Sequence, residues 1–335
     1  MRRLLRRFAA ALLLVIAIAS GSAYVVLRML DAPGPLAQDT AVVIPKGAGL
    51  AAIGRILAEA GVVREPWQAM AAARLRSANR QLRAGEFLFP RQVNAFDAIE
   101  ILRSGQPVIR RFTVAEGLTV MQVIQLLEKE PALVGAVPAV PPEGSLLPET
   151  YHYSWGDARA ELIERMRGKM RDTLAELWPR RAPGSPVRSP EEAVILASIV
   201  EKETSVPEER ARVAGVFANR LEAGMRLQSD PTVVYALTEG ARPLGRSLTR
   251  ADLRMESPYN TYMVDGLPPG PIANPGPASI EAVLNPETHQ FLYFVADGNG
   301  GHAFARTLAE HNRNVARWRA TMREQQVQPA ESPSN

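Results

Sequence analysis

The sequence predicts an α+β protein that consists of an N-terminal apolar helix, a small α+β module and a larger mixed α+β domain. Residues 8–27 contain no charged side chain, which is typical of a membrane-spanning helix. The segment that follows alternates short β-type runs with stretches of helical spacing. The chain has 335 residues, of which 46% are hydrophobic, enough for two modest domains with their own cores.

Composition excludes several classes of function. The net charge is +4 at pH 7 and four arginines lie within the first seven residues, so the charge is too small and too local for nucleic-acid binding. The chain has no cysteine, which excludes disulfides and thiolate metal sites. We expect no metal and no cofactor, because no phosphate-binding or dinucleotide motif is present and the histidines lack paired ligand spacing. The histidines are His152, His289, His302 and His311.

Residues 8–27 are predicted to form a transmembrane helix within an anchor segment, 1–30. Twenty residues at helical rise span about 30 Å, the hydrocarbon thickness of a bilayer. The arginines before this run predict a cytoplasmic N-terminus, with everything after Arg28 outside. The alternative is a cleaved signal peptide, for which Ala-Ile-Ala at 17–19 offers a cleavage site. The apolar run continues past that site, which favours a retained anchor, and both interpretations exclude a cytosolic protein.

The segment 31–105 is predicted to be the small α+β module. It begins with a linker, 31–40, that contains proline and glycine. From their spacing we expect strands at 41–44 and 86–89 and helices at 50–60, 66–77 and 95–104. Gly47 begins a strand–turn–helix pattern that recurs at Gly117, either through duplication or by chance.

The segment 106–150 is predicted to connect the module to a larger domain, 151–326. A strand is expected at 108–114 and a helix at 119–127, followed by a proline-rich stretch. Within the larger domain, helices are expected at 158–178 and 307–326. Another should begin at Ser189, with Ser189 as N-cap, Pro190 at the first position and Glu192 completing a capping box. The tail, 327–335, is predicted to be disordered.

The helix that begins at Pro190 ends in an abrupt change of polarity. Residues 193–200 are aliphatic except for Ser198, and Glu-Lys-Glu-Thr follows from Glu201. Burial of a carboxyl disfavours its charged form, which would suit Glu201 to donate a proton. The alternative is a solvated helix end, which spacing alone favours because unpaired acids are seldom buried. Ser198 is expected to pack or to bond back to its own turn rather than act as a nucleophile.

Two further segments carry side chains that suit a sugar ligand. In Arg-Leu-Gln-Ser-Asp-Pro-Thr, 226–232, Gln228 can donate and accept hydrogen bonds, and Asp230 before Pro231 is typical of a helix N-cap. Tyr-Asn-Thr-Tyr, 259–262, precedes a loop rich in proline and glycine at 266–276. Rigid loops lose less entropy when a ligand binds. Taken alone, each segment is equally compatible with a helix start or an ordinary connector.

These motifs occur together, in one order, in a known family. They are Leu-Ala-Ser-Ile-Val-Glu-Lys-Glu-Thr at 196–204, Val-Phe-Ala-Asn-Arg-Leu at 216–221, the segments at 225–232, 259–262 and 266–276, and Leu-Tyr-Phe-Val-Ala at 292–296, with Gly-His at 301–302. The whole chain, anchor included, resembles the endolytic murein transglycosylases of the YceG-like (MltG) family.

The resemblance implies an inner-membrane protein with one transmembrane helix, a cytoplasmic N-terminus, a LysM-like subdomain at 31–105 and a periplasmic catalytic domain at 151–326. It implies a lyase that cuts the β-1,4 bond between N-acetylmuramic acid and N-acetylglucosamine inside nascent peptidoglycan strands. The products would carry 1,6-anhydro ends, and strand elongation would stop. Peptidoglycan strands, the membrane and peptidoglycan synthases are the partners that the resemblance implies.

The resemblance also assigns roles to particular residues. The catalytic acid and base would be Glu201, the first glutamate of its motif. The glycan cleft would be lined by Gln228, Asp230, Tyr259, Asn260 and Tyr262. An alternative of a different class is a membrane-anchored scaffold that binds peptidoglycan without cutting it.

Overall fold

The computed structural model describes residues 2–76, 82–137 and 139–327. Two compact units are present, and each is described by itself. The first is Met1–Arg111 with Ala132–Val134 and His152–Asp157; the second is Phe112–Pro131, Gly135–Tyr151 and Ala158–Asn335. The predicted domain boundaries do not coincide with the edges of these units and stay predictions. The predicted tail from 328 onward lies outside the described residues.

The first unit begins with a long helix, α1 (Arg2–Asp31). Its stretch Arg6–Asp31 is long and apolar enough to cross a membrane, and its most apolar part is not buried by other parts of the protein. The helix continues without a break through residues 17–19. Near its end Leu30 is fully buried, in the core of the first unit. The N-terminal apolar helix that the sequence predicts is therefore confirmed as a helix.

The rest of the first unit places two strands and three helices around one core. Strand β1 (Thr40–Ile44) pairs antiparallel with β2 (Gly85–Phe89), with Val42 opposite Phe87. The helices are α2 (Leu50–Glu59), α3 (Pro66–Leu75) and α4 (Ala95–Ser104). Each of these elements was predicted within two residues, and the α+β class is confirmed. The LysM-like assignment stays a prediction.

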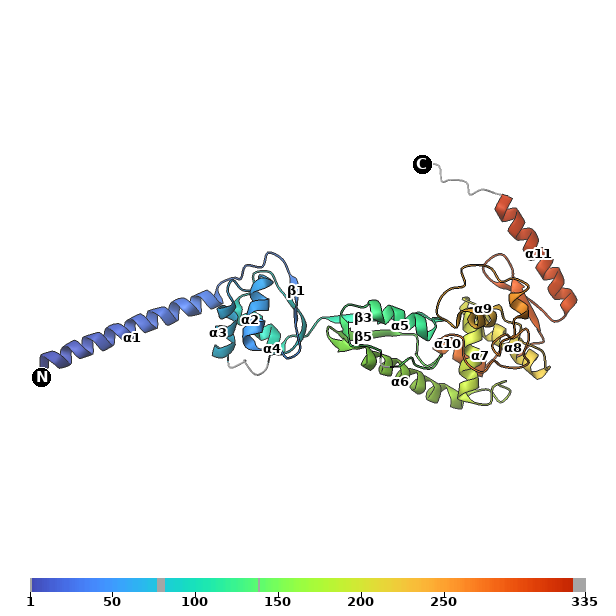
Figure 1. The fold of residues 1–335 in the computed structure, drawn as a ribbon, viewed down its shortest axis with the longest axis horizontal. Coiled ribbons are helices and arrows are strands. Elements are labelled where there is room, and N and C mark those ends of the chain that lie inside the picture. The colour runs from blue at the N-terminus through green and yellow to red at the C-terminus, as the bar shows by residue number, and fades with distance from the viewer. Residues whose placement is uncertain (1, 77–81, 138, 328–335) are drawn as a thin grey trace. The chain divides into compact units, whose positions relative to one another are not determined.

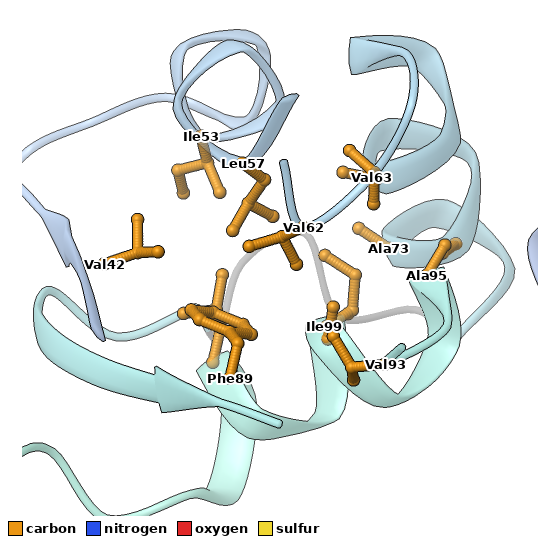
Figure 2. Close-up of a cluster of buried hydrophobic side chains, with 14 of the residues drawn as sticks. Val42, Ile53, Leu57, Val62, Val63, Ala73, Phe89, Val93, Ala95 and Ile99 are labelled. Carbon is orange, nitrogen blue, oxygen red and sulfur yellow. The ribbon is translucent and has the colours of Figure 1, made fainter. Parts of the chain in front are cut away.

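The core of the first unit is filled by side chains from every one of these elements. Val42 of β1 and Phe89 of β2 point toward Ile53 and Leu57 of α2 and toward Ile99 of α4 (Figure 2). Leu57, Phe89 and Ile99 have no exposed surface. Burying a large apolar side chain contributes about 1.5–3 kcal/mol, so these contacts explain why short, locally weak elements form here.

The second unit is mainly helical. Its helices are α5 (Val120–Lys129), α6 (Arg159–Leu177), α7 (Pro190–Glu203), α8 (Arg210–Glu222), α9 (Asp230–Thr238), α10 (Pro277–Leu284) and α11 (Leu308–Val327). Short 3-10 turns occur at Trp178–Arg180, Pro207–Glu209 and Asp252–Arg254. Helix α7 packs against α8 and α10 (Figure 1). It is therefore buried on more than one face, as its aliphatic run predicts.

The remaining strands are short and pair two by two. Among the described residues, β7 (Tyr293–Ala296) pairs antiparallel with β8 (His302–Ala305), and this hairpin packs against α11. The other strands are β3 (Ile109–Thr113), β4 (Leu133–Val134), β5 (Thr150–Ser154) and β6 (Asp157–Ala158). They pair as β3 with β5 and β4 with β6.

Two predicted helix caps differ in detail from the structure. At α7, Ser189 accepts from the Glu192 N–H as predicted, but the Glu192 carboxylate accepts from the Arg188 N–H at 2.7 Å instead of completing the capping box. At α9, the N-cap position is Ser229, so the prediction that Asp230 caps this helix is wrong. Asp230 is the first residue of the helix, and its carboxylate accepts a hydrogen bond from the Tyr262 hydroxyl.

Candidate active site

Helix α7 carries Glu201 into a buried position in its last turn. The Glu201 side chain is only 5% exposed, so the solvated-end alternative is wrong. Ser198, one turn earlier, donates to the Ile195 carbonyl at 2.7 Å and accepts from the Ile272 N–H at 3.0 Å. Ser198 thus bonds back to its own turn, as expected, and also ties α7 to the proline-rich loop at 266–276.

Two distant chain segments cross beside the end of α7. The Gly117 N–H donates to the Asn274 carbonyl at 3.0 Å, and the Asn274 N–H donates to the Leu118 carbonyl at 2.9 Å. The Asn274 side chain is fully buried; its amide donates to the Leu118 carbonyl and accepts from the Leu146 N–H, both at 2.9 Å. We call this arrangement the Gly117–Asn274 crossing. It fixes the backbone on either side of Glu201.

The Glu201 carboxyl is held by two donors that come from these surroundings. Its Oε2 accepts from the Gly276 N–H at 2.9 Å, and its Oε1 lies 3.6 Å from the Arg210 Nη2. The same guanidinium nitrogen lies 3.2 Å from Oε2 of Glu116. A Cβ on residue 276 would stand 1.8 Å from the Glu116 Oε1, so a side chain there would push the Glu116 carboxyl out of its place beside Arg210.

The arrangement places two acids around one cation. Burial raises the pKa of Glu116, the negative charge of Glu201 raises it further, and Arg210 opposes both effects. The Arg210 side chain is 14% exposed, and its Nε is buried with no hydrogen-bond partner among the described residues. This N–H is therefore an unsatisfied buried donor. Sequence reasoning missed both Glu116 and Arg210, because neither stands out from other charged residues in its own segment.

A second carboxyl, Glu203, occupies the opposite side of the same helix end. The Ser229 hydroxyl donates to its Oε1 at 2.5 Å. Burial raises the pKa of Glu203 to about 7, with a further contribution from Asp230, while Ser229, His302 and Arg220 act in the opposite direction. Residues two apart on a helix point in different directions, so Glu201 and Glu203 have separate surroundings.

The structure brings the two predicted sugar-binding segments together. The Tyr262 hydroxyl donates to Asp230 Oδ1 at 2.6 Å. Between them, the Thr261 hydroxyl accepts from the Ser229 N–H at 2.9 Å and lies 2.8 Å from the Thr232 hydroxyl. Thr261 is fully buried, so this connection is part of the core and holds the two segments in register.

The other predicted cleft residues are placed differently. Tyr259 packs against Tyr235, with ring centroids 4.9 Å apart. Gln228 is exposed and its backbone is left-handed, with φ at 48°, a conformation uncommon outside glycine. Asn260 is fully buried, and its amide donates to the backbone carbonyls of the preceding turn. Asn260 therefore shapes the loop from inside.

A groove of about 510 Å³ lies in this unit, and Glu201 itself is not among the residues that line it. Lys202, the next residue in α7, lines it together with Asp230 and Tyr235 of α9. The Lys202 ammonium also donates to the Gly117 carbonyl at 3.2 Å, which joins the groove to the Gly117–Asn274 crossing. A larger hollow of about 760 Å³ lies elsewhere in the unit, with His289 and Asn219 among its lining residues, and is not lined by Glu116, Glu201 or Glu203.

A family model described as the YceG-like family matches residues 42–317. The chain belongs to the YceG-like family. It is 40% identical over 173 residues to an endolytic murein transglycosylase of Bacillus subtilis, covering 52% of this chain and 47% of that protein. It is 28% identical over 348 aligned positions to one of Streptococcus pneumoniae, covering 88% of this chain and 61% of that protein. The chain thus spans about half to three fifths of the length of these relatives.

A solved structure supports the family assignment. A YceG-like protein of Listeria monocytogenes is 29% identical and matches this fold with a TM-score of 0.51. The match covers 82% of this chain and 98% of that one. The YceG-like fold therefore includes most of the described elements.

Gly276→Ala should impair the site, because the new Cβ would displace the Glu116 carboxyl. We expect a loss of at least about tenfold in catalytic rate, since small displacements at a reacting group are costly. The matched control is Gly184→Ala, whose Cβ would meet no atom within 4 Å. Rates of glycan-strand cleavage, the activity proposed in the next subsection, test this with the whole chain carrying either substitution. Wild-type rates for Gly276→Ala would contradict the described packing.

The pKa of Glu203 predicts a pH-dependent stability. Its pKa is about 7 in the fold against an ordinary value of 4.5. Between these values the folded state binds more protons than the unfolded state, so stability falls as pH rises through this window and is constant above it. The loss is on the order of 3 kcal/mol at most.

Glu203→Gln keeps the acceptor for Ser229 and cannot ionise. We expect its free energy of unfolding to fall less between pH 5 and pH 8 than that of the wild type, as measured by urea unfolding of the full chain in detergent. Glu222→Gln, at an exposed acid of α8, is the control and should behave as the wild type. An unchanged pH dependence in Glu203→Gln would show that Glu203 ionises normally.

Proposed function

We propose that this YceG-like protein is an endolytic lytic transglycosylase that cuts the bond between N-acetylmuramic acid and N-acetylglucosamine within peptidoglycan strands. The observation that carries the proposal is the buried Glu201 carboxyl, bound by the Gly276 N–H and close to Arg210. The relatives named endolytic murein transglycosylase support the choice of substrate. A groove lined by Lys202, the residue after Glu201, offers a place for part of the substrate.

The first chemical step needs an acid at the glycosidic oxygen. Protonated Glu201 donates its proton to this oxygen, the bond from the oxygen to C1 of the muramic acid breaks, and positive charge develops on the sugar ring. The leaving strand departs with a free hydroxyl. Glu201 is then a carboxylate, the form that the Gly276 N–H and the Arg210 guanidinium are placed to bind.

The second step returns the proton to Glu201. The carboxylate takes the proton of the 6-hydroxyl on the same muramic acid, and the oxygen of that hydroxyl forms a bond to C1. The product is a 1,6-anhydro ring, and no water is consumed. One carboxyl therefore serves both steps, in contrast to hydrolases that use a pair of acids.

Glu116 and Arg210 are positioning residues in this proposal. Arg210 lies between the two carboxyls and restricts where the Glu201 oxygens can lie. Glu116 holds Arg210 from the far side, and its own position depends on the absence of a side chain at Gly276. Gln228, Asp230, Tyr259 and Tyr262 are proposed to bind the glycan, with Asn260 supporting their loop from inside.

The anchor places this chemistry at a membrane surface. In this proposal α1 is retained, spans the inner membrane once with its N-terminus in the cytoplasm, and carries both units into the periplasm. The stretch Arg6–Asp31 is long and apolar enough to cross a membrane, which supports this placement. Peptidoglycan synthases are proposed partners because such an enzyme would act on strands as they leave the membrane.

Glu201→Gln tests the proposal, because it keeps the shape of the side chain and removes the proton. We expect cleavage of uncrosslinked glycan strands to fall at least about 100-fold, the scale of general acid–base catalysis. Products are read by mass spectrometry, and thermal unfolding checks that the variant folds. Glu203→Gln, at the neighbouring acid, is the matched control and should retain far more activity. Substantial cleavage by Glu201→Gln would contradict the assignment, and strand binding without cleavage by the wild type would favour a scaffold.

A further inference from the structure

The groove beside Lys202 has a charge pattern that the cleavage chemistry does not require. Its lining includes three cationic side chains, Lys202, Arg242 and Arg246, and among the described lining residues one acid, Asp230. Arg246 is neutralised by Asp252, which accepts at 2.6 and 3.0 Å. Asp230 accepts from the Tyr262 hydroxyl. Within the described part of the chain, Lys202 and Arg242 form no ion pair with an acid, which leaves the groove with net positive charge.

The groove also has several apolar lining residues, and hydrogen bonds hold one of its walls in place. Apolar lining comes from Pro231, Val234, Pro243, Leu244, Leu248 and Ile272. The wall that carries Arg242 is attached to α5, because the Thr119 hydroxyl donates to the Gly240 carbonyl at 2.6 Å and the Gln125 amide donates to the Ala241 carbonyl at 3.2 Å. A volume of about 510 Å³ lies within the range of ordinary ligand pockets.

We propose that this groove binds the acidic peptide stem carried by the muramic acid of a glycan strand. This inference rests on the proposed function, because it assumes that the sugar bound at Glu201 is a muramic acid. The stem starts at the sugar's lactyl group, and Lys202, the residue next to Glu201 in α7, is one of the residues that line the groove. A stem alternates small aliphatic side chains with free carboxylates, which matches an apolar groove with cations at its edge.

The consequence is selection between strands. Arg242 pairs with a carboxylate of the stem, and Lys202 lies where the stem leaves the sugar. A strand with stems therefore binds better than a stripped strand. The rate of glycan cleavage then depends on whether the strand still carries its peptide stems. Because Arg242 is exposed, the contribution of its ion pair decreases as salt rises.

Arg242→Glu tests this with the full chain in detergent. Two substrates are compared, uncrosslinked strands that carry peptide stems and the same strands after an amidase has removed the stems. We expect the ratio of kcat/KM for stem-bearing over stripped strands to fall about tenfold in Arg242→Glu, the effect of losing one charge-assisted contact. The matched control is Arg250→Glu, the same charge change at an exposed arginine outside the groove lining, which should keep the wild-type ratio.

A binding measurement separates this inference from the proposed function. A fluorescent acidic stem tetrapeptide should bind the wild type and Arg250→Glu, and should bind Arg242→Glu about tenfold more weakly. If the wild type cuts neither substrate while the peptide binds, the proposed function fails and the peptide site stands. An unchanged kcat/KM ratio and unchanged peptide binding in Arg242→Glu would overturn the inference. If Arg242→Glu lowers kcat/KM only for strands that are still linked to a lipid pyrophosphate, the groove binds phosphate instead. That result would also overturn the inference.

Discussion

The Gly117–Asn274 crossing is the constraint on which the site depends. Two backbone hydrogen bonds and both ends of the buried Asn274 amide join segments that are far apart in the chain. The crossing places the Gly276 N–H against Glu201 and the Gly117 carbonyl against Lys202. Gly117 has a φ of 75°, a backbone conformation that favours glycine. The position of the Glu201 carboxyl is therefore determined by backbone atoms as much as by α7.

The two neighbouring carboxyls at the end of α7 have different charged and polar surroundings. Glu201 shares Arg210 with Glu116, while Glu203, two residues away, is surrounded by Ser229, Asp230 and His302. An acid–base catalyst must be able to exist in both protonation states during one turnover. The Gly276 N–H and Arg210 lie beside the nearly buried Glu201 carboxyl, where they can bind the carboxylate form that the second step of the proposed reaction needs.

Local sequence patterns predicted where the helices lie, but they did not predict the contacts between segments that are distant in the chain. Ser189, Pro190 and the aliphatic run to Val200 predicted where α7 begins and that Glu201 follows a buried helix, because caps and spacing act over a few residues. The partners of Glu201 come from other segments, and no local pattern marks Arg210 or Glu116 as its neighbours. Asp230 shows the same limit: the cap signal predicted a helix start there, but the N-cap is Ser229, and the partner of Asp230 is Tyr262 from a distant segment. The motifs at 259–262 and 266–276 predicted a rigid loop, yet not that Asn260 would be buried inside it.

The central claim is that a single carboxyl suffices, because the attacking oxygen belongs to the substrate. Digestion of glycan strands by the full-length protein in water labelled with oxygen-18 tests this most directly. The account predicts anhydro ends that are lighter by one water than reducing ends and that carry no label. Labelled reducing ends would show that water attacks C1, and a second carboxyl, with Glu116 as the first candidate, would then have to activate that water.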